Sequence, residues 1–167
     1  MCKKYIHYGS EHFDLKAFEP IKNCFRFNKP KGGLWASPID AEDSWYNFCK
    51  CNRYKTDELE RSFEFKLANN TNVLYLNDVI TVIDRRNREY YLNDHSLHNC
   101  IRINEPLPSD PFMPAIFAHG INIDFQWLMM SRYDAIEVRM DDIFYWDLYG
   151  WDVDSLLVMN PDCVVEL

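Results

Sequence analysis

Long apolar runs are missing from this sequence, and so is the opening pattern of a secreted protein. The longest apolar runs, such as Ile116–Ala118 and Leu156–Met159, fall far short of the ~20 residues that a transmembrane helix needs. The opening residues 1–7 are followed by polar residues and not by the apolar stretch of a secretory signal. No internal repeat or low-complexity segment is present. These absences argue against a membrane-spanning or repeat protein and predict a cytoplasmic one.

The sequence also lacks the ligand spacing of a metal site. The six cysteines are Cys2, Cys24, Cys49, Cys51, Cys100 and Cys163. Cys49 and Cys51 are separated by one residue, whereas structural zinc sites commonly use two to four, and no second pair completes them. We expect free thiols, with Cys49 buried and Cys51 half-exposed on one helix, and no bound metal.

Positive charge is scarce relative to negative charge. Lys and Arg number 18 and Asp and Glu 26, which gives a formal net charge of −8. An acidic domain repels a phosphate backbone, so a protein partner is favoured over a nucleic acid. Hydrophobic residues make up 47% and aromatic residues 16% of the 167 residues, enough for one packed core. The sequence therefore predicts a single domain over residues 1–167.

Many short segments with alternating or compact apolar residues predict strands. They cover residues 4–8, 34–36, 62–67, 73–76, 133–138, 155–159 and 163–167. Helices are expected over residues 40–51, capped by Asp40 or Ser37, from Asn77 or Asp78 to Ile83, and over residues 123–130. The polar, proline-containing stretch 85–114 predicts a long surface loop that could include a short helix. The sum is a mixed α+β domain with a mostly antiparallel sheet and a few helices.

Several charged and aromatic residues have structural interpretations. The basic run 85–88 is typical of a helix end, although it could also steer a pyrophosphate. An acidic cluster is expected to form a solvated hairpin face; it comprises Asp141, Asp142, Asp147, Asp152 and Asp154. Three tryptophans are expected to serve packing, namely Trp127, Trp146 and Trp151.

Three separated segments carry residue types that suit a chemical site. The first is His7-Tyr8-Gly9-Ser10, at the end of the first expected strand. The second is Gly33-Leu34-Trp35-Ala36-Ser37, followed by a helix that carries Ser44-Trp45. The third is Tyr133-Asp134-Ala135-Ile136, followed by residues 152–161.

The order of these motifs resembles the ADP-ribosyltransferase superfamily, in its diphtheria-toxin and PARP-like branch. The resemblance implies a split-sheet fold, NAD as the substrate, and a small bacterial or phage toxin or effector. It implies that His7, Tyr8, Gly9 and Ser10 contact the nicotinamide-side ribose and the amide. It further implies that Trp35, after Gly33, stacks on the nicotinamide, with Ser37 near the ring and Ser44-Trp45 supplying the second aromatic wall.

The motif that carries the catalytic Glu in this branch differs here. Ser155 stands at that position, preceded by Asp154. Ser155 can bond a ribose hydroxyl but supplies no charge, so Asp154 or Asp152 is expected to supply it after a change of register. The change would be one residue for Asp154 and three for Asp152, and in a regular strand residues at these offsets face away from the side that Ser155 faces. Glu166 is a third candidate, on a different strand.

Elementary chemistry supports the same constellation. Cleavage of NAD needs a flat apolar site for the nicotinamide, a ribose hydrogen-bond partner and a negative charge near the anomeric carbon. Trp35 and Trp45 can provide the first, and His7 the second. The sequence therefore predicts NAD-dependent ADP-ribosyl transfer to a macromolecule, with His7, Asp154 and Ser155 at the reacting centre. The alternatives are a weakened NAD- or ADP-ribose-binding module of the same fold, or a protein-interaction module.

Overall fold

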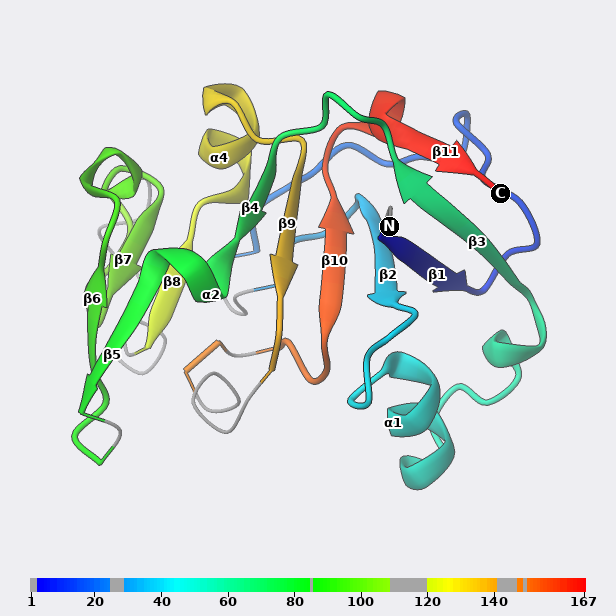
Figure 1. Ribbon diagram of the computed structural model, residues 1–167, viewed down its shortest axis with the longest axis horizontal. Coiled ribbons are helices and arrows are strands. Elements are labelled where there is room, and N and C mark those ends of the chain that lie inside the picture. The colour runs from blue at the N-terminus through cyan, green and yellow to red at the C-terminus, as the bar shows by residue number, and fades with distance from the viewer. Residues whose placement is uncertain (1–2, 25–28, 85, 109–119, 141–146, 149) are drawn as a thin grey trace.

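A seven-stranded sheet forms the centre of the computed structural model, which describes residues 3–24, 29–84, 86–108, 120–140, 147–148 and 150–167 (Figure 1). Its strand order is β11-β3-β1-β2-β10-β9-β4, and only the β4–β9 pair is parallel. These strands are β1 (Lys4–Tyr8), β2 (Leu34–Pro38), β3 (Ser62–Leu67), β4 (Val73–Tyr75), β9 (Ala135–Val138), β10 (Ser155–Val158) and β11 (Val164–Glu166). The expected α+β class with a mostly antiparallel sheet is confirmed.

Two hairpins and short helices complete the described fold. The hairpins are β5 (Ile80–Asp84) with β6 (Glu89–Leu92), and β7 (Ile101–Ile103) with β8 (Ile121–Ile123). The α-helices are α1 (Trp45–Asn52), α2 (Leu76–Val79) and α4 (Phe125–Ser131), and the 3-10 helices are η1 (Glu58–Glu60), η2 (His95–Leu97) and η3 (Pro161–Cys163). Figure 1 shows the hairpins beside β4 and α1 near one end of β2.

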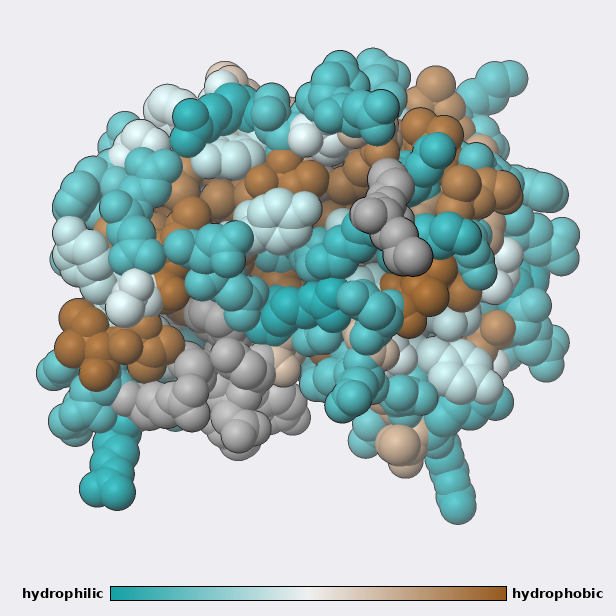
Figure 2. All heavy atoms as spheres, in the orientation of Figure 1, coloured by the Kyte–Doolittle hydropathy of each residue, from teal (hydrophilic) through white to brown (hydrophobic). Residues whose placement is uncertain are grey.

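Alternate side chains of the central strands enter two hydrophobic clusters. Ile136 and Leu157 belong to a cluster that extends to the two hairpins and α4, whereas Ala135 and Leu156 belong to a second cluster with β1 and β3. Successive strand residues face opposite sides, so both faces of β9 and β10 are buried. In Figure 2 polar residues cover much of the visible face, with apolar residues showing between them.

The strands β1 and β2 separate after a short pairing. Their ladder contains only Tyr5 opposite Pro38 and Ile6 opposite Ser37, whereas β1 and β3 pair at five positions. Beyond Ile6 the contact between β1 and β2 passes to a side chain, since His7 Nδ1 lies 2.7 Å from the carbonyl oxygen of Trp35. Figure 1 shows β1 crossing β2 at a wide angle. The two halves of the sheet therefore diverge on one side of this junction.

The first helix begins later than the sequence predicts. Ser37 and Pro38 end β2, and the helix cap is Ser44, whose hydroxyl accepts from the amide of Asn47. Ser37 and Asp40 as caps are therefore wrong. The buried Ser37 hydroxyl instead accepts from the amide of Trp45, which ties the start of α1 to β2.

The segment between residues 77 and 114 also differs from expectation. The expected helix is a single turn, α2, followed by β5, and the expected loop contains β6, η2 and β7 in its described part. Ile80, Leu92 and Ile101 are all buried, so contacts with the core outweigh the loop-like local composition. Residues 86–88 form the turn between β5 and β6, held by amide bonds to the Asp84 carboxylate, and not a helix end.

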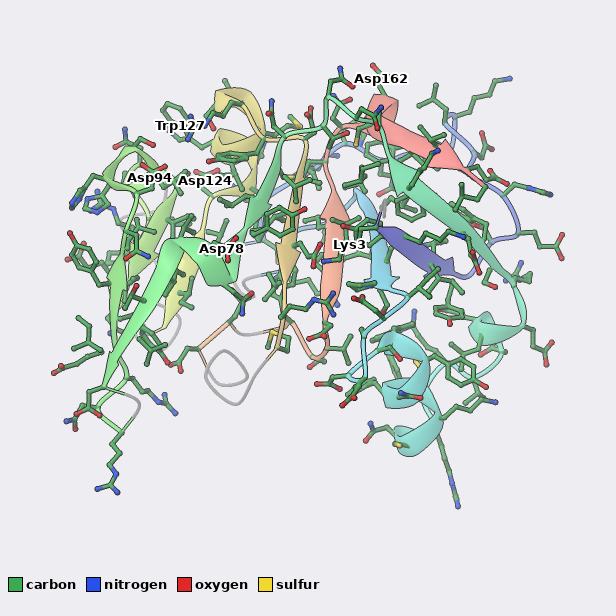
Figure 3. The ribbon with its side chains drawn as sticks, viewed as in Figure 1. Lys3, Asp78, Asp94, Asp124, Trp127 and Asp162 are labelled. Carbon is green, nitrogen blue, oxygen red and sulfur yellow. The ribbon has the colours of Figure 1, made fainter. Side chains whose placement is uncertain are left out.

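The predictions for the third helix and for the packing tryptophans are confirmed only in part. The helix expected from residue 123 begins at Phe125, because the Asp124 carboxylate caps it by accepting from the Trp127 amide. Trp127 is 47% exposed and points outward in Figure 3, so its packing role is wrong, whereas Trp151 is buried as expected. Trp146, Asp141 and Asp142 lie outside the described residues.

The acidic cluster is not a solvated face in its described part. Asp147 and Asp154 are buried. The Asp147 carboxylate accepts from the Tyr90 hydroxyl and lies near Arg88, and the Asp154 carboxylate accepts from Arg139. Both carboxylates therefore have specific partners. Both Cys49 and Cys51 lie on α1, where Cys49 is buried as expected and Cys51 is exposed rather than half-exposed.

Gly33 precedes β2 in a conformation that only glycine adopts easily. Its φ is +70°, and a Cβ there would lie 2.6 Å from Leu157 Cδ1 and 2.8 Å from the carbonyl oxygen of Val158. The close approach that glycine permits at this position is therefore to β10.

We expect Gly33→Ala to lower the free energy of unfolding by about 2 kcal/mol or more. The cost combines the left-handed backbone with overpacking against β10. Gly9→Ala is the control, because Gly9 also has a positive φ, +116°, but its nearest neighbour for a Cβ is His7 Nε2 at 3.8 Å. Urea denaturation would measure both, and equal losses would contradict the packing role of Gly33.

Candidate functional site

A cavity of about 300 Å³ lies where β1 and β2 diverge. Four stretches of chain line it, namely β1, residues 29–37, the region from α1 to η1, and residues 152–155. The lining residues are Ile6, His7, Tyr8, Lys29, Trp35, Ala36, Ser37, Trp45, Tyr54, Lys55, Glu58, Asp152, Val153 and Ser155. The cavity therefore joins the three motifs that the sequence singles out.

The structure brings six of the eleven sequence-predicted site residues to this cavity. They are His7, Tyr8, Trp35, Ser37, Trp45 and Ser155. Ser10 and Gly33 line a neighbouring cavity of about 400 Å³, which shares His7 and Trp35 with the first. Gly9, Ser44 and Asp154 line neither cavity.

The orientation of His7 is set by a backbone carbonyl. Nδ1 donates to the Trp35 oxygen at 2.7 Å, and the ring of Phe63 lies 5.2 Å from the imidazole. Burial lowers the pKa of His7, opposed by the Trp35 bond and the charge of Glu58. A neutral ring that donates from Nδ1 carries its lone pair on Nε2. His7 can therefore accept a hydrogen bond from a ligand hydroxyl.

Two half-buried indoles provide flat apolar surface in the cavity. Trp35 packs edge-on against buried Trp151, with ring centroids 4.7 Å apart. Trp45 stacks on Phe48 at 5.5 Å and meets Tyr54 edge-on at 5.9 Å. Because each indole has aromatic neighbours, both are held in place and can bind a planar ring without much loss of side-chain freedom.

The ammonium group of Lys29 lies over both indoles. Nζ is 4.7 Å from the ring centroid of Trp35 and 5.8 Å from that of Trp45. Burial lowers the pKa of Lys29, and the nearby charge of Asp152 opposes this shift. A cation therefore already occupies the face of the aromatic surface, next to a carboxylate.

Two carboxylates line the cavity. Asp152 is half-buried and comes from the segment that leads into β10, and Glu58 is on η1 and pairs with Lys55 Nζ at 2.9 Å. The buried Ser155 donates its hydroxyl to the carbonyl oxygen of Val153 at 2.8 Å. Charge at this site is available from Asp152 and Glu58, and Ser155 supplies only a hydroxyl.

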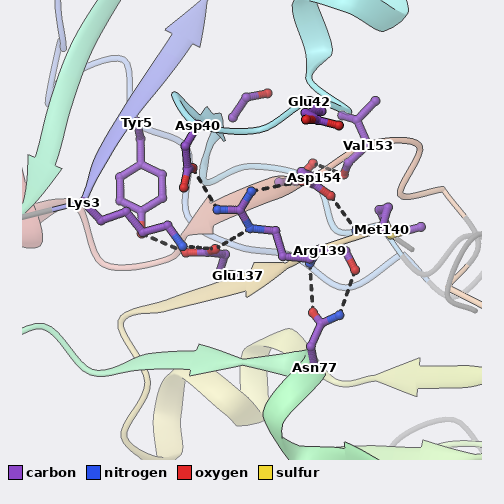
Figure 4. Close-up of polar contacts among 12 residues, drawn as sticks. Lys3, Tyr5, Asp40, Glu42, Asn77, Glu137, Arg139, Met140, Val153 and Asp154 are labelled. Carbon is purple, nitrogen blue, oxygen red and sulfur yellow. Dashed lines mark hydrogen bonds and ion pairs between the residues drawn. The ribbon is translucent and has the colours of Figure 1, made fainter. Parts of the chain in front are cut away.

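Asp154 is turned away from the cavity by its hydrogen bonds. Val153 and Ser155 line the cavity, whereas the Asp154 carboxylate accepts from the amide of Met140 at 2.7 Å and from Arg139 Nη1 at 3.0 Å (Figure 4). The structure therefore does not place Asp154 at the reacting centre. The bonds to Met140 and Arg139 hold it away from the cavity, whereas Asp152, two residues earlier, does line the cavity.

Arg139 links Asp154 to two other parts of the chain. Its guanidinium also donates to the buried Glu137 and to exposed Asp40, between β2 and α1. The amide of Asp154 donates to the carbonyl oxygen of Asp43 at 2.9 Å. Glu137 in turn accepts from the Tyr5 hydroxyl and from Lys3 (Figure 4). This network holds the cavity walls that carry Trp45 and Ser155 in register.

Glu166, the third candidate carboxylate, lies outside the cavity. It accepts from the amide of Phe13 and contacts His12 Nδ1 at 2.7 Å, and these bonds lower the pKa of Glu166. Glu166 therefore has a structural role at the surface, where it connects β11 with the segment that follows β1.

The sequence reasoning missed Lys29, Tyr54, Lys55 and Glu58 as cavity residues. Lys29 belongs to a turn rich in Pro and Gly, whose composition indicates only a turn. Glu58 and Lys55 lie in a charged segment without periodicity, in which a solvated surface is the usual interpretation. Only the tertiary path of this segment past His7 brings them to the cavity.

We expect Asp154→Asn to lower the free energy of unfolding by about 2–3 kcal/mol, because a buried charge-assisted bond to Arg139 is lost. Asp40→Asn removes another acceptor of the same guanidinium, but Asp40 is exposed, so a loss below about 1 kcal/mol is expected. Urea denaturation of both variants is the measurement. Unchanged stability of Asp154→Asn would contradict the structural role.

His7 contributes to the free energy of unfolding, and we expect this contribution to vary with pH. Its lowered pKa means that the unfolded chain binds more protons, so the contribution is complete above about pH 6.5 and is lost as the pH falls below it. The difference in unfolding free energy between the wild type and His7→Gln should therefore shrink between about pH 7.5 and about pH 5.

His12→Gln is the control for this measurement. The bond to Glu166 raises the pKa of exposed His12, so its contribution is present below about pH 6.5 and is lost as the pH rises. The two variants should thus show opposite trends. The same trend in both would contradict the assignment for His7.

Comparison with known proteins adds no relative. No protein-family profile, no curated protein and no solved structure matches this chain. Among the described residues, no helix combines the length and apolar character needed to span a membrane, and no group of three or more His, Cys, Asp or Glu side chains is arranged to hold a metal ion. The role of the cavity is therefore argued from its own chemistry.

Proposed function

We propose that this protein binds NAD in the cavity between β1 and β2 and transfers ADP-ribose from it to a protein acceptor. One observation carries the proposal: His7, Trp35, Trp45, Asp152 and Ser155, which come from distant parts of the sequence, line one cavity. The divergence of β1 from β2 supports the proposed split-sheet, ADP-ribosyltransferase-like fold.

The nicotinamide ring and the adjoining ribose each have a suitable partner. The nicotinamide ring lies against the indoles of Trp35 and Trp45. His7 Nε2 accepts from a hydroxyl of the adjoining ribose, and the Ser155 hydroxyl lies within the same cavity. The neighbouring cavity, reached past His7 and Trp35, offers room for the remainder of the dinucleotide.

The reaction breaks the bond between the anomeric carbon of the ribose and the nicotinamide nitrogen. The bonding electrons leave with the nicotinamide, and positive charge develops on the anomeric carbon. A nucleophilic side chain of the acceptor then bonds that carbon and loses its proton to solvent. A fixed carboxylate beside the developing charge stabilises this transition state.

Asp152 is proposed as that carboxylate in place of Asp154. Asp152 lines the same cavity as the two indoles, and its charge favours the charged form of the Lys29 ammonium that lies over them. Asp154 is committed to Arg139 and Met140. Glu58 is the less favoured candidate because Lys55 pairs with it.

The acceptor and setting follow from charge and from the resemblance. A net charge of −8 disfavours nucleic acid and leaves a protein as the proposed acceptor. A cytoplasmic toxin or effector of bacterial or phage origin is the proposed setting.

The test is release of nicotinamide from NAD together with transfer of labelled ADP-ribose to protein in a cell extract. Asp152→Asn keeps the shape of the side chain but removes its charge. We expect turnover to fall about 100-fold, which corresponds to about 2.7 kcal/mol of transition-state stabilisation, with a smaller loss of NAD affinity because the same carboxylate attracts the bound pyridinium. Asp162→Asn, on the exposed η3, is the matched control and should have full activity.

Undiminished turnover in Asp152→Asn would overturn the assignment of this residue. A 100-fold loss in Glu58→Gln with an active Asp152→Asn would move the catalytic charge to η1. Absence of both nicotinamide release and NAD binding in the wild type would overturn the proposed function.

A binding module of the same fold is the second candidate. Ser155 at the position of the family Glu favours it, because its hydroxyl donates to Val153 and carries no charge. Such a module would be stabilised by NAD without releasing nicotinamide, since a ligand raises stability by RT ln(1 + [L]/Kd). Trp45→Ala should abolish that stabilisation, and Ser155→Glu should introduce turnover.

A further inference from the structure

The ammonium group of Lys29 lies in an unusual environment for a lysine side chain. Lysine commonly keeps its ammonium in water and buries only its methylene groups. Here the ammonium lies 4.7 Å from the centroid of Trp35 and 5.8 Å from that of Trp45, and burial lowers its pKa. The cavity therefore contains a position that holds a cation against two aromatic faces.

The surroundings of this position are suited to positive charge. Indole faces attract cations through their quadrupole, and Trp is the strongest of the aromatic side chains in this respect. The cavity also contains Asp152, which favours the charged form of Lys29. The second cation of the cavity, Lys55, is paired with Glu58 at 2.9 Å. Asp152 is thus the carboxylate that complements a cation over the indoles.

We infer that the cavity recognises its ligand as an organic cation with a flat ring, and that the Lys29 side chain is an internal competitor for the same position. The inference deepens the proposed function, on which it rests for the identity of the ligand: the oxidised dinucleotide carries a positively charged pyridinium ring. A ligand cation that displaces Lys29 leaves the charge balance with Asp152 unchanged.

Two consequences follow for a transferase. The reduced dinucleotide has a neutral ring and competes poorly with Lys29, so the site selects the oxidised form. Cleavage converts the bound pyridinium into neutral nicotinamide, which loses its attraction to Asp152 and to the indole faces. The return of Lys29 then favours release of the product.

The experiment compares two small probes by isothermal titration calorimetry. 1-Methylnicotinamide carries the pyridinium charge, and nicotinamide has nearly the same shape without it. Both are titrated into the full chain as wild type, Lys29→Ala and Lys31→Ala. Lys31 is exposed in the same turn and makes a backbone bridge to Lys22, so its variant controls for net charge.

We expect the wild type to bind 1-methylnicotinamide more tightly than nicotinamide. Lys29→Ala should raise the affinity for the cation by about tenfold, with a smaller change for the neutral probe, because competition and like-charge repulsion are both removed. Lys31→Ala should leave both affinities within about twofold of the wild type. Lys29→Gln, which keeps the length of the side chain without its charge, should also strengthen cation binding and guards against a collapsed cavity in the alanine variant.

Several results would overturn the inference. They are equal affinity for the two probes, weaker or unchanged cation binding in both Lys29 variants, or no binding of either probe to any variant. Its failure is distinguishable from that of the proposed function. Release of nicotinamide from NAD without a preference for charge removes only the inference, whereas cation selectivity without NAD cleavage removes only the transferase proposal.

Discussion

The guanidinium of Arg139 joins three parts of the chain on which the cavity depends. Arg139 directly follows β9, and its guanidinium bonds Glu137 on β9, Asp154 just before β10 and Asp40 between β2 and α1. Three carboxylates thus share one guanidinium. The side chain of Asn77 fixes the backbone of Arg139, because its amide group donates to the Arg139 carbonyl oxygen and its oxygen accepts from the Arg139 amide. Breaking one member of a buried ionic network leaves an uncompensated charge, which makes such a network act as a unit.

The cavity is a consequence of how this network and the sheet are combined. The network holds Asp154, just before β10, away from the cavity, whereas its neighbours Val153 and Ser155 line it. The early end of the β1–β2 ladder provides the space, and the bond from His7 to Trp35 closes the junction. A site that is built by strands and buried ion pairs is better positioned than one built by loops alone.

In the proposed function, the charged groups of the cavity act in both ligand binding and catalysis. In the proposed reaction, Asp152 and the indoles favour a cation before the bond breaks, and the same carboxylate stabilises the positive charge that develops on the ribose. Binding and catalysis would thus draw on one electrostatic feature, which is efficient because a preorganised charge needs no rearrangement in the transition state. Lys29 is then the group against which the ligand has to compete.

The sequence by itself determined the strands of the central sheet and part of the cavity lining. Strong alternation predicted β1 and β3, the compact apolar run predicted β10, and His7, Trp35, Trp45 and Ser155 were identified from motif order. The same local information failed where burial decided the conformation, as in β5 to β7, and where a distant partner decided a side chain's role. Ser37 bonds the start of α1, and Asp154 bonds Arg139. Only the tertiary structure brought Lys29 and Glu58 to the cavity and turned Asp154 away from it, because contacts between residues far apart in sequence leave no periodic signal.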